Sequence, residues 1–230
     1  MIIPRYNFFV KPAMIASDMD LKIDSRNTID SLRQEMEAKY KKLPLCQEAR
    51  DVIHGEGPVP SRVMLIGEAP GYYEYVQRRP FVGRSGQLLR KTLTSVGFPP
   101  ESVYISNIVK ARPPENRDPT PEEIMAYKPY LDCEIALVAP QLIVTLGRYS
   151  MAKFLPEVKI SQVHGRLHQV KWQDKLTYIL PMYHPAAALR AGEVLKSFQA
   201  DFAKMAKILT YVENQLQTHD FADTVLTALV

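Results

Sequence analysis

The feature that most constrains the fold is a series of four short apolar runs, each too short for a helix and separated by segments with helical periodicity. The runs are VMLIG, VYISNIV, LIVTLG and YILPMYH, at residues 63–67, 103–109, 142–147 and 178–184. The middle two are rich in β-branched residues, and polar residues, Gly or Pro bound most of their ends, as is typical of buried strands. This alternation predicts a four-stranded parallel sheet between two layers of helices, an α/β/α fold.

The segments around these runs have the patterns of helices. GQLLRKTLTSVGF follows the first run, and TPEEIMAYKPYLDCEIALV opens with a capping box formed by Thr120 and Glu123. RNTIDSLRQEMEAKYKKL precedes the first run, and Thr28 or Asp30 could cap this helix. RYSMAKFL follows the third run. Residues 192–216 have the pattern of a long amphipathic C-terminal helix. VHGRLHQVKW alternates and contains a Gly, which predicts a hairpin or an edge strand before the fourth run.

Length and composition indicate one globular domain at residues 25–217, preceded by an extension at 1–24 and followed by a tail at 218–230. A hydrophobic content of 46% suffices for a core, and the net charge of +4 permits a nucleic-acid partner without requiring one. The start of the chain lacks the features of a signal peptide, and no apolar stretch approaches the length of a membrane span. We therefore expect a cytoplasmic, monomeric protein in a reducing compartment, with no membrane contact.

Chemically active side chains follow the predicted strands, at the edge where parallel sheets bind ligands. Glu68 follows the first run, Asn107 lies in the second, and His184 ends the fourth, while the Pro80-Phe81 pair lies a short loop away. Each alone has a structural interpretation: a helix-start carboxylate, a turn amide, a loop histidine and a core aromatic. Their predicted convergence at one edge favours a site.

A carboxylate, an aromatic ring, an amide and an imidazole in one site could together hydrolyse the N-glycosidic bond of a nucleotide flipped out of DNA. An aromatic face and an amide can recognise a planar heterocycle by stacking and by paired hydrogen bonds. A carboxylate can orient a water or stabilise a cationic sugar, and an imidazole can hydrogen-bond the base oxygen that gains negative charge. Basic residues on the surrounding loops can hold phosphates.

Five motifs in series resemble those of the uracil-DNA glycosylase superfamily, specifically its family 4. They are GEAPG, RPFVGRSGQLL, VYISNIVKARPPENRDPTPEE, APQLIVTLG and HPAAALR, and the resemblance covers about residues 43–190. It implies base excision of uracil from single- or double-stranded DNA, by a monofunctional enzyme that leaves an abasic site.

The resemblance also implies residue roles. Glu68 and His184 are the expected catalytic residues, and the expected uracil-binding residues are Ala69, Pro70, Phe81 and Asn107. We expect DNA contacts from Ser85, Arg112, Asn116, Arg117, Leu189 and Arg190. Asn107 would accept from uracil N3–H and donate to O4, a pattern that cytosine reverses.

The chain departs from family 4 at the cysteines that usually hold a [4Fe–4S] cluster. The expected pair before the first strand is Cys46 and Ala49 here, and the other two positions hold Ala111 and Tyr127. A cubane typically needs four cysteine thiolates, so we expect no cluster, no metal and no other cofactor. We expect Ala111 and Tyr127 to fill the space by packing.

A second departure lies in YYEYVQRRPF, where Tyr75 replaces a common Asp and Arg78 a common Gly. This leaves open whether Glu68 or Glu74 positions the water. Tyr72, Tyr73 and Tyr75 are all candidates for excluding the thymine methyl group.

Two other functions stay open on sequence grounds. The first is a non-catalytic protein that recognises DNA or uracil, and the second is an enzyme acting on free nucleotides. The second lacks the Gly-rich phosphate loop with its Lys.

Overall fold

The computed structural model describes residues 28–228, with side chains as far as residue 218. The predicted N-terminal extension at 1–24 lies outside the described residues. The strands are β1 (Val63–Gly67), β2 (Tyr104–Asn107), β3 (Leu142–Leu146), β4 (His168–Trp172) and β5 (Lys175–Met182). The longer helices are α1 (Ile29–Ala38), α3 (Arg84–Ser95), α4 (Pro121–Val138), α8 (Gly192–Phe202) and α9 (Met205–Ala228). The short ones are α2 (Tyr72–Gln77), α5 (Arg148–Ala152), α6 (Ile160–Val163) and α7 (Pro185–Ala188).

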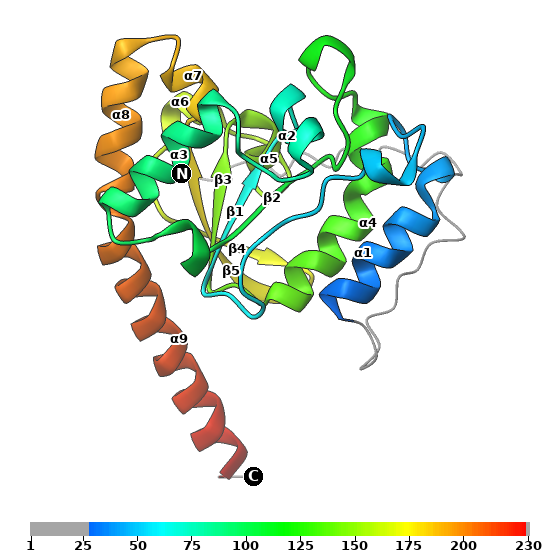
Figure 1. The fold of residues 1–230 in the computed structure, drawn as a ribbon. Coiled ribbons are helices and arrows are strands. Elements are labelled where there is room, and N and C mark those ends of the chain that lie inside the picture. Colours follow the sequence, from blue (N-terminus) through cyan, green and yellow to red (C-terminus); the bar gives the residue numbers. More distant parts are fainter. Residues whose placement is uncertain (1–27, 229–230) are drawn as a thin grey trace.

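The five strands form one sheet in the order β2-β1-β3-β5-β4 (Figure 1). The first four in this order run parallel, and β4 pairs antiparallel with β5 at the edge. The predicted four-stranded parallel sheet and the α/β/α class are confirmed, and the alternating segment before the fourth run forms the edge strand β4.

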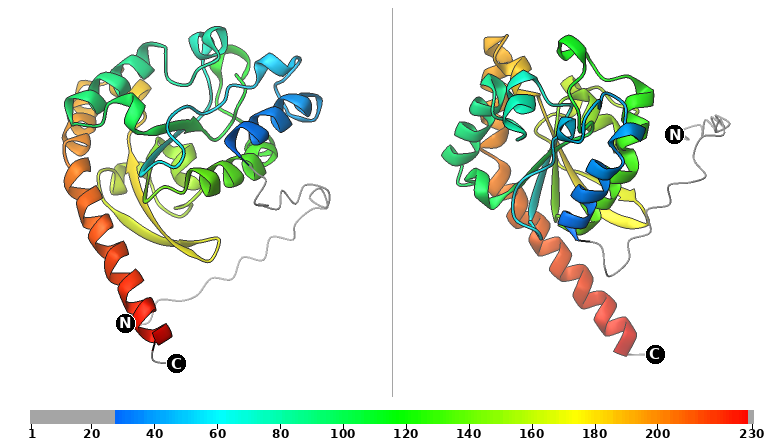
Figure 2. Two further views of the ribbon diagram at one scale, coloured as in Figure 1. Left: turned by 60° about the horizontal axis from the view of Figure 1, so that its bottom comes forward. Right: turned by 45° about the vertical axis from the view of Figure 1, so that its right-hand side comes forward.

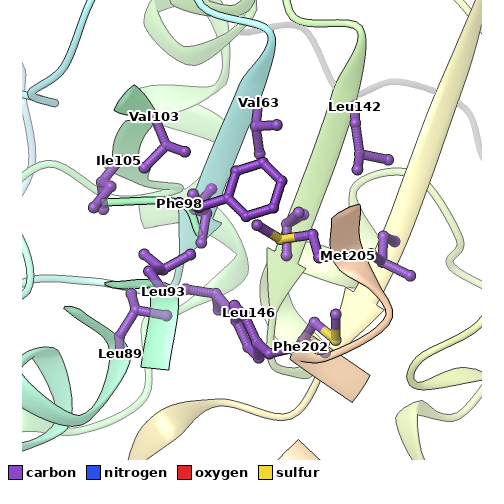
Figure 3. Packing of buried hydrophobic residues seen from close by; sticks show 14 of the residues in the cluster. Val63, Leu89, Leu93, Phe98, Val103, Ile105, Leu142, Leu146, Phe202 and Met205 are labelled. Carbon is purple, nitrogen blue, oxygen red and sulfur yellow. The ribbon is translucent and has the colours of Figure 1, made fainter. Parts of the chain in front are cut away.

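Side chains alternate between the two faces of the sheet, as the pleat requires. Val63 and Leu65 of β1 pack with α3, α8 and α9, whereas Met64 and Ile66 pack with α1 and α4. Figure 3 shows part of the first cluster. Helices thus cover both faces and leave the carboxyl edge of the strands to the connecting loops.

Local signals explain several helix boundaries. Thr28 caps α1, and Thr120 with Glu123 forms the predicted capping box of α4, with Pro121 in the first turn. The predicted C-terminal helix is divided, because α8 ends at Phe202 and α9 begins at Met205. The predicted tail starts at residue 218, yet α9 continues as a helix to Ala228 and projects past the sheet (Figure 2).

No helix among residues 28–228 combines the length and apolarity needed to cross a membrane.

Candidate active site

A cavity of about 620 Å³ opens at the carboxyl edge of the sheet. All the site residues predicted from the sequence line it except Arg112 and Leu189. The predicted residues in its wall are Glu68, Ala69, Pro70, Phe81, Ser85, Asn107, Asn116, Arg117, His184 and Arg190. Side chains from four loops, distant in sequence, therefore share one space.

Asn107 ends β2 directly beside the end of β1, because the register pairs it with Gly67. A Cβ on Gly67 would lie 2.4 Å from Asn107 Oδ1 and 2.4 Å from Cζ of Phe81, so only Gly lets these two side chains meet here. Asn107 is 4% exposed, and its buried Oδ1 has no hydrogen-bond partner among the residues that the structure describes. A buried polar atom without a partner is costly, which suits an acceptor kept for a ligand.

Phe81 is held in an unusual backbone conformation. Its φ of 54° lies in the left-handed region, which is rare for a bulky residue. A Cβ on Gly86 would lie 2.0 Å from the Phe81 carbonyl carbon, so α3 packs directly against this backbone. Arg90 Nε donates to the Phe81 carbonyl oxygen at 2.7 Å. These contacts fix the buried Phe81 ring, whose centroid lies 6.0 Å from that of His184.

His184 caps α7, with its Nδ1 accepting from the Ala186 backbone N–H at 3.2 Å. Burial and the nearby Arg190 charge lower the pKa of His184 to about 4. The imidazole is therefore neutral at pH 7, with its proton on Nε2. A neutral donor of this kind can hydrogen-bond an oxygen that gains negative charge.

Glu68 lies in the cavity wall with a pKa raised to about 7. Burial is the main cause and the Asp118 carboxylate adds to it, whereas Arg148 and Arg190 oppose the shift. Asp118 itself accepts from Arg148 Nη2 at 2.5 Å and from the Tyr149 hydroxyl at 2.7 Å. Glu68 can therefore exist as carboxylate or acid near neutral pH.

Glu74 has a different environment. Its Oε1 accepts from the backbone N–H groups of Val82 and Gly83, at 2.9 and 2.8 Å. These bonds tie α2 to the start of α3. Glu74 also lines the cavity, but as a loop anchor, and this favours Glu68 as the carboxylate available to a water.

Tyr72, Tyr73 and Tyr75 are the candidates for excluding the thymine methyl group, and that role stays a prediction. Tyr72, Tyr73 and Tyr75 are absent from the cavity lining, where the chain presents Gly71 and Glu74 instead. The reason is the turn of α2, which buries Glu74 and directs Tyr72 and Tyr73 to solvent.

Arg112 and Leu189 lie outside the cavity wall. Arg112 stacks its guanidinium 5.2 Å from the centroid of the Tyr72 ring and donates through Nε to Asn116 at 2.8 Å. Leu189 follows α7 and is 45% exposed. Arg117 lines the cavity while forming a two-nitrogen ion pair with Glu123.

Asp118, Arg148, Ile160 and Tyr183 also line the cavity and are not among the site residues predicted from the sequence. Tyr183 directly follows β5 and Arg148 lies two positions after β3, so both carry the signal of a strand end. Asp118 has no such signal, since only the packing of loops brings it to this space.

Pro44, Cys46, Ala111 and Tyr127 form a packed group that we term the Cys46 corner; the last three are positions at which the resemblance to family 4 implies cluster cysteines. The Tyr127 hydroxyl donates to the Pro44 carbonyl oxygen at 2.7 Å and lies 3.3 Å from Cys46 Sγ. Because the Tyr127 hydroxyl already donates its proton to Pro44, it can only accept from Cys46, and the Cys46 thiol is the donor of that hydrogen bond. Ala111 and Tyr127 are fully buried.

This corner does not fit a cluster. Burial raises the pKa of the Cys46 thiol, whereas a ligand must be a thiolate. The other cysteine of the chain, Cys133, lies on α4 and packs in the core. Among the side chains described, at residues 28–218, no three of His, Cys, Asp or Glu are grouped to hold a metal ion.

Comparison with known proteins matches residues 54–210 to the family model described as Uracil DNA glycosylase superfamily. The type-4 uracil-DNA glycosylase of Sulfurisphaera tokodaii is 37% identical over 188 residues, covering 79% of this chain and 85% of that protein. That of Pyrobaculum aerophilum is 40% identical over 168 residues, covering 70% of this chain and 85% of that protein. That of Archaeoglobus fulgidus is 36% identical over 187 residues, covering 79% of this chain and 93% of that protein.

Proposed function

The chain belongs to the uracil-DNA glycosylase superfamily, and we propose that it hydrolyses the N-glycosidic bond of uracil in DNA, releasing free uracil and leaving an abasic site. The observation that carries this proposal is the meeting of Glu68, Phe81, Asn107 and His184 around one cavity. A base can reach such a cavity only by leaving the helical stack, so the nucleotide enters flipped out.

Asn107 reads the base. Its partnerless Oδ1 accepts from N3–H of uracil, and its amide N–H donates to O4. Cytosine carries an acceptor at N3 and a donor at C4, so both contacts fail. Each unsatisfied buried group costs roughly 1–3 kcal/mol. Phe81 stacks on the ring and holds its plane.

His184 and Glu68 act on the bond. As the C1′–N1 bond breaks, its electron pair moves onto the base, and His184 Nε2–H donates to uracil O2 as charge collects there. The sugar becomes oxocarbenium-like, and the Glu68 carboxylate stabilises it and accepts a proton from the attacking water. The water oxygen forms the new C1′–O bond, the uracil anion takes a proton from solvent on release, and Glu68 returns its proton to solvent.

We further propose that the enzyme is monofunctional. A lyase step needs an amine nucleophile, and no lysine is present among the described residues that line the cavity. Lys110, which closely follows β2, is 1% exposed and pairs with Glu134 and Ser106 inside the core. It has no access to the sugar.

The chemistry above uses side chains alone, and we propose that the protein works without a cluster or other cofactor, as a monomer inside the cell. On the DNA side, Arg148 and Arg190 at the cavity mouth suit phosphates, and the exposed Leu189 suits the space left by the flipped base.

The test is incubation of the protein with oligonucleotides that contain one uracil, cytosine or thymine, followed by alkali. Strand breakage at uracil alone is the expected result, and no breakage without alkali is expected. Retention of the uracil oligonucleotide without breakage would instead indicate a binding protein. Repeating the assay after chelation, with iron measured in the same preparation, checks the cofactor-free mechanism.

A further inference from the structure

Two exposed tyrosines lie beside the mouth of the cavity. Tyr72 and Tyr73 are 54% and 56% exposed, and their ring centroids are 5.5 Å apart in an edge-to-face arrangement. They directly follow Gly71, which lines the cavity. A Cβ on Gly83 would lie 3.5 Å from Cδ2 of Tyr73, so this ring leans against the start of α3.

A cation completes this surface. The Arg112 guanidinium lies 5.2 Å from the Tyr72 ring centroid, and Arg112 Nε donates to Asn116, itself a cavity residue. The stacked arginine and its hydrogen bond orient the Tyr72 ring and place a positive charge beside it.

Exposed aromatic rings next to a guanidinium are the kind of surface on which unpaired bases stack. Single exposed apolar residues need no explanation, but here two rings and a cation adjoin the cavity that takes the flipped nucleotide. In a duplex the neighbouring bases remain stacked on one another. In a single strand they are free to stack on a protein side chain.

We propose that Tyr72, Tyr73 and Arg112 form a stacking platform for an unpaired base of the uracil-containing strand, next to the flipped nucleotide. This proposal rests on the proposed function, and it adds that single-stranded DNA is a substrate the enzyme is built to hold. The rings supply stacking and Arg112 contacts the adjoining phosphate.

Affinity for single strands provides the first test. The probe is an oligonucleotide with one 2′-fluoro-2′-deoxyuridine, whose fluorine disfavours the oxocarbenium-like state and slows cleavage. Tyr72→Ala and Tyr73→Ala should each raise its Kd about tenfold, whereas the Phe variants, which keep the ring face, should stay within about twofold. For the same probe in a duplex, the Kd of the two Ala variants should rise by no more than about twofold.

A matched control is Tyr211→Ala. Tyr211 is 53% exposed on α9, whose Thr210 and Glu213 line a separate cavity with Val63 at the opposite end of β1. This variant should bind the single strand as the wild type does. Arg112→Gln should lower the slope of log K against log salt by about 0.7, the value for one phosphate contact on a single strand.

A double-mutant cycle identifies the stacked base. The base at each of the two positions on either side of the uracil is replaced in turn by an abasic linker. At one position, removing the base and the Tyr72→Ala change should each weaken binding, and the combined loss of affinity should be smaller than the sum of the two. Additive losses at every position, or wild-type affinity in both Ala variants, would overturn the platform.

Excision assays separate this proposal from the proposed function. If the wild type releases no uracil from any DNA, the proposed function fails. If the wild type releases uracil while the Ala variants keep wild-type kcat/KM on single strands, the platform alone fails. The expected result is a lower kcat/KM on single strands with an unchanged rate at saturation.

Discussion

The cavity and the Cys46 corner lie in the same domain and differ in how their polar groups are used. In the cavity, Asn107 Oδ1 is buried without a partner in the described part of the chain, and the pKa of Glu68 is raised to about 7. In the corner, the Tyr127 hydroxyl makes a hydrogen bond to Pro44 and another to Cys46. Unused bonding capacity marks a place for a ligand, whereas satisfied capacity marks a structural role.

The comparison also explains which departures from family 4 the chain tolerates. The cavity keeps each of the four side chains on which the proposed chemistry depends. In the corner, the buried Ala111 and Tyr127 occupy two of the positions at which the resemblance to family 4 implies cluster cysteines. We infer that the corner fixes loops and that packing can replace a cluster in that role.

The largest expected effect is on stability, from Tyr127→Ala in the corner. Removing a fully buried aromatic side chain costs about 3–5 kcal/mol in the free energy of unfolding. Urea denaturation should show this loss, while the single-turnover rate of the remaining folded protein stays close to that of the wild type. A folded Tyr127→Ala protein with no excision would show that the corner takes part in the chemistry, and Tyr211→Ala serves as an exposed control.

The converse change is His184→Ala in the cavity. Removing one donor to a developing oxyanion costs about 10²–10³ in rate, and the single-turnover excision rate should fall by that factor. His184→Asn keeps an acceptor for the start of α7, so it should restore stability without restoring the rate. A restored rate in His184→Asn would reduce His184 to a helix cap.

The pH dependence of excision should report Glu68. Only the carboxylate can accept a proton from water, so the single-turnover rate should rise about tenfold per pH unit below pH 7 and level off above it. Asp118→Asn removes a charge that raises the pKa of Glu68, and the profile should shift to lower pH. A Glu68→Gln protein that retained the wild-type profile would assign this ionisation to another group.

The smallest expected effect is from Cys46→Ser. Serine keeps a donor to the Tyr127 hydroxyl, so the free energy of unfolding should change by about 1 kcal/mol or less, with no change in excision rate. Iron analysis of both proteins completes the comparison. Iron bound by the wild type and lost in the variant would contradict our interpretation of the corner.

Much of the architecture could be predicted from the sequence, because short β-branched runs and amphipathic spacing are local signals. The first strand was predicted with its observed bounds, and the capping box at Thr120 marked the start of α4. The split between α8 and α9 was not predicted, because the apolar spacing continues through residues 203 and 204 without Gly or Pro.

The residue types at the strand ends, and therefore the candidate set of Glu68, Asn107 and His184, were readable from the sequence alone, since strand order in a parallel sheet sends them to one edge. Only the tertiary structure decided how each is tuned. The pKa of Glu68 depends on Asp118, 50 positions along the chain, and the proton position on His184 depends on the turn into α7. The orientation of α2 is a second example: it buries Glu74, which anchors the loop, and leaves the Tyr72 ring exposed to solvent. Periodicity determines which elements form, but electrostatics and orientation depend on distances between segments that no local pattern encodes.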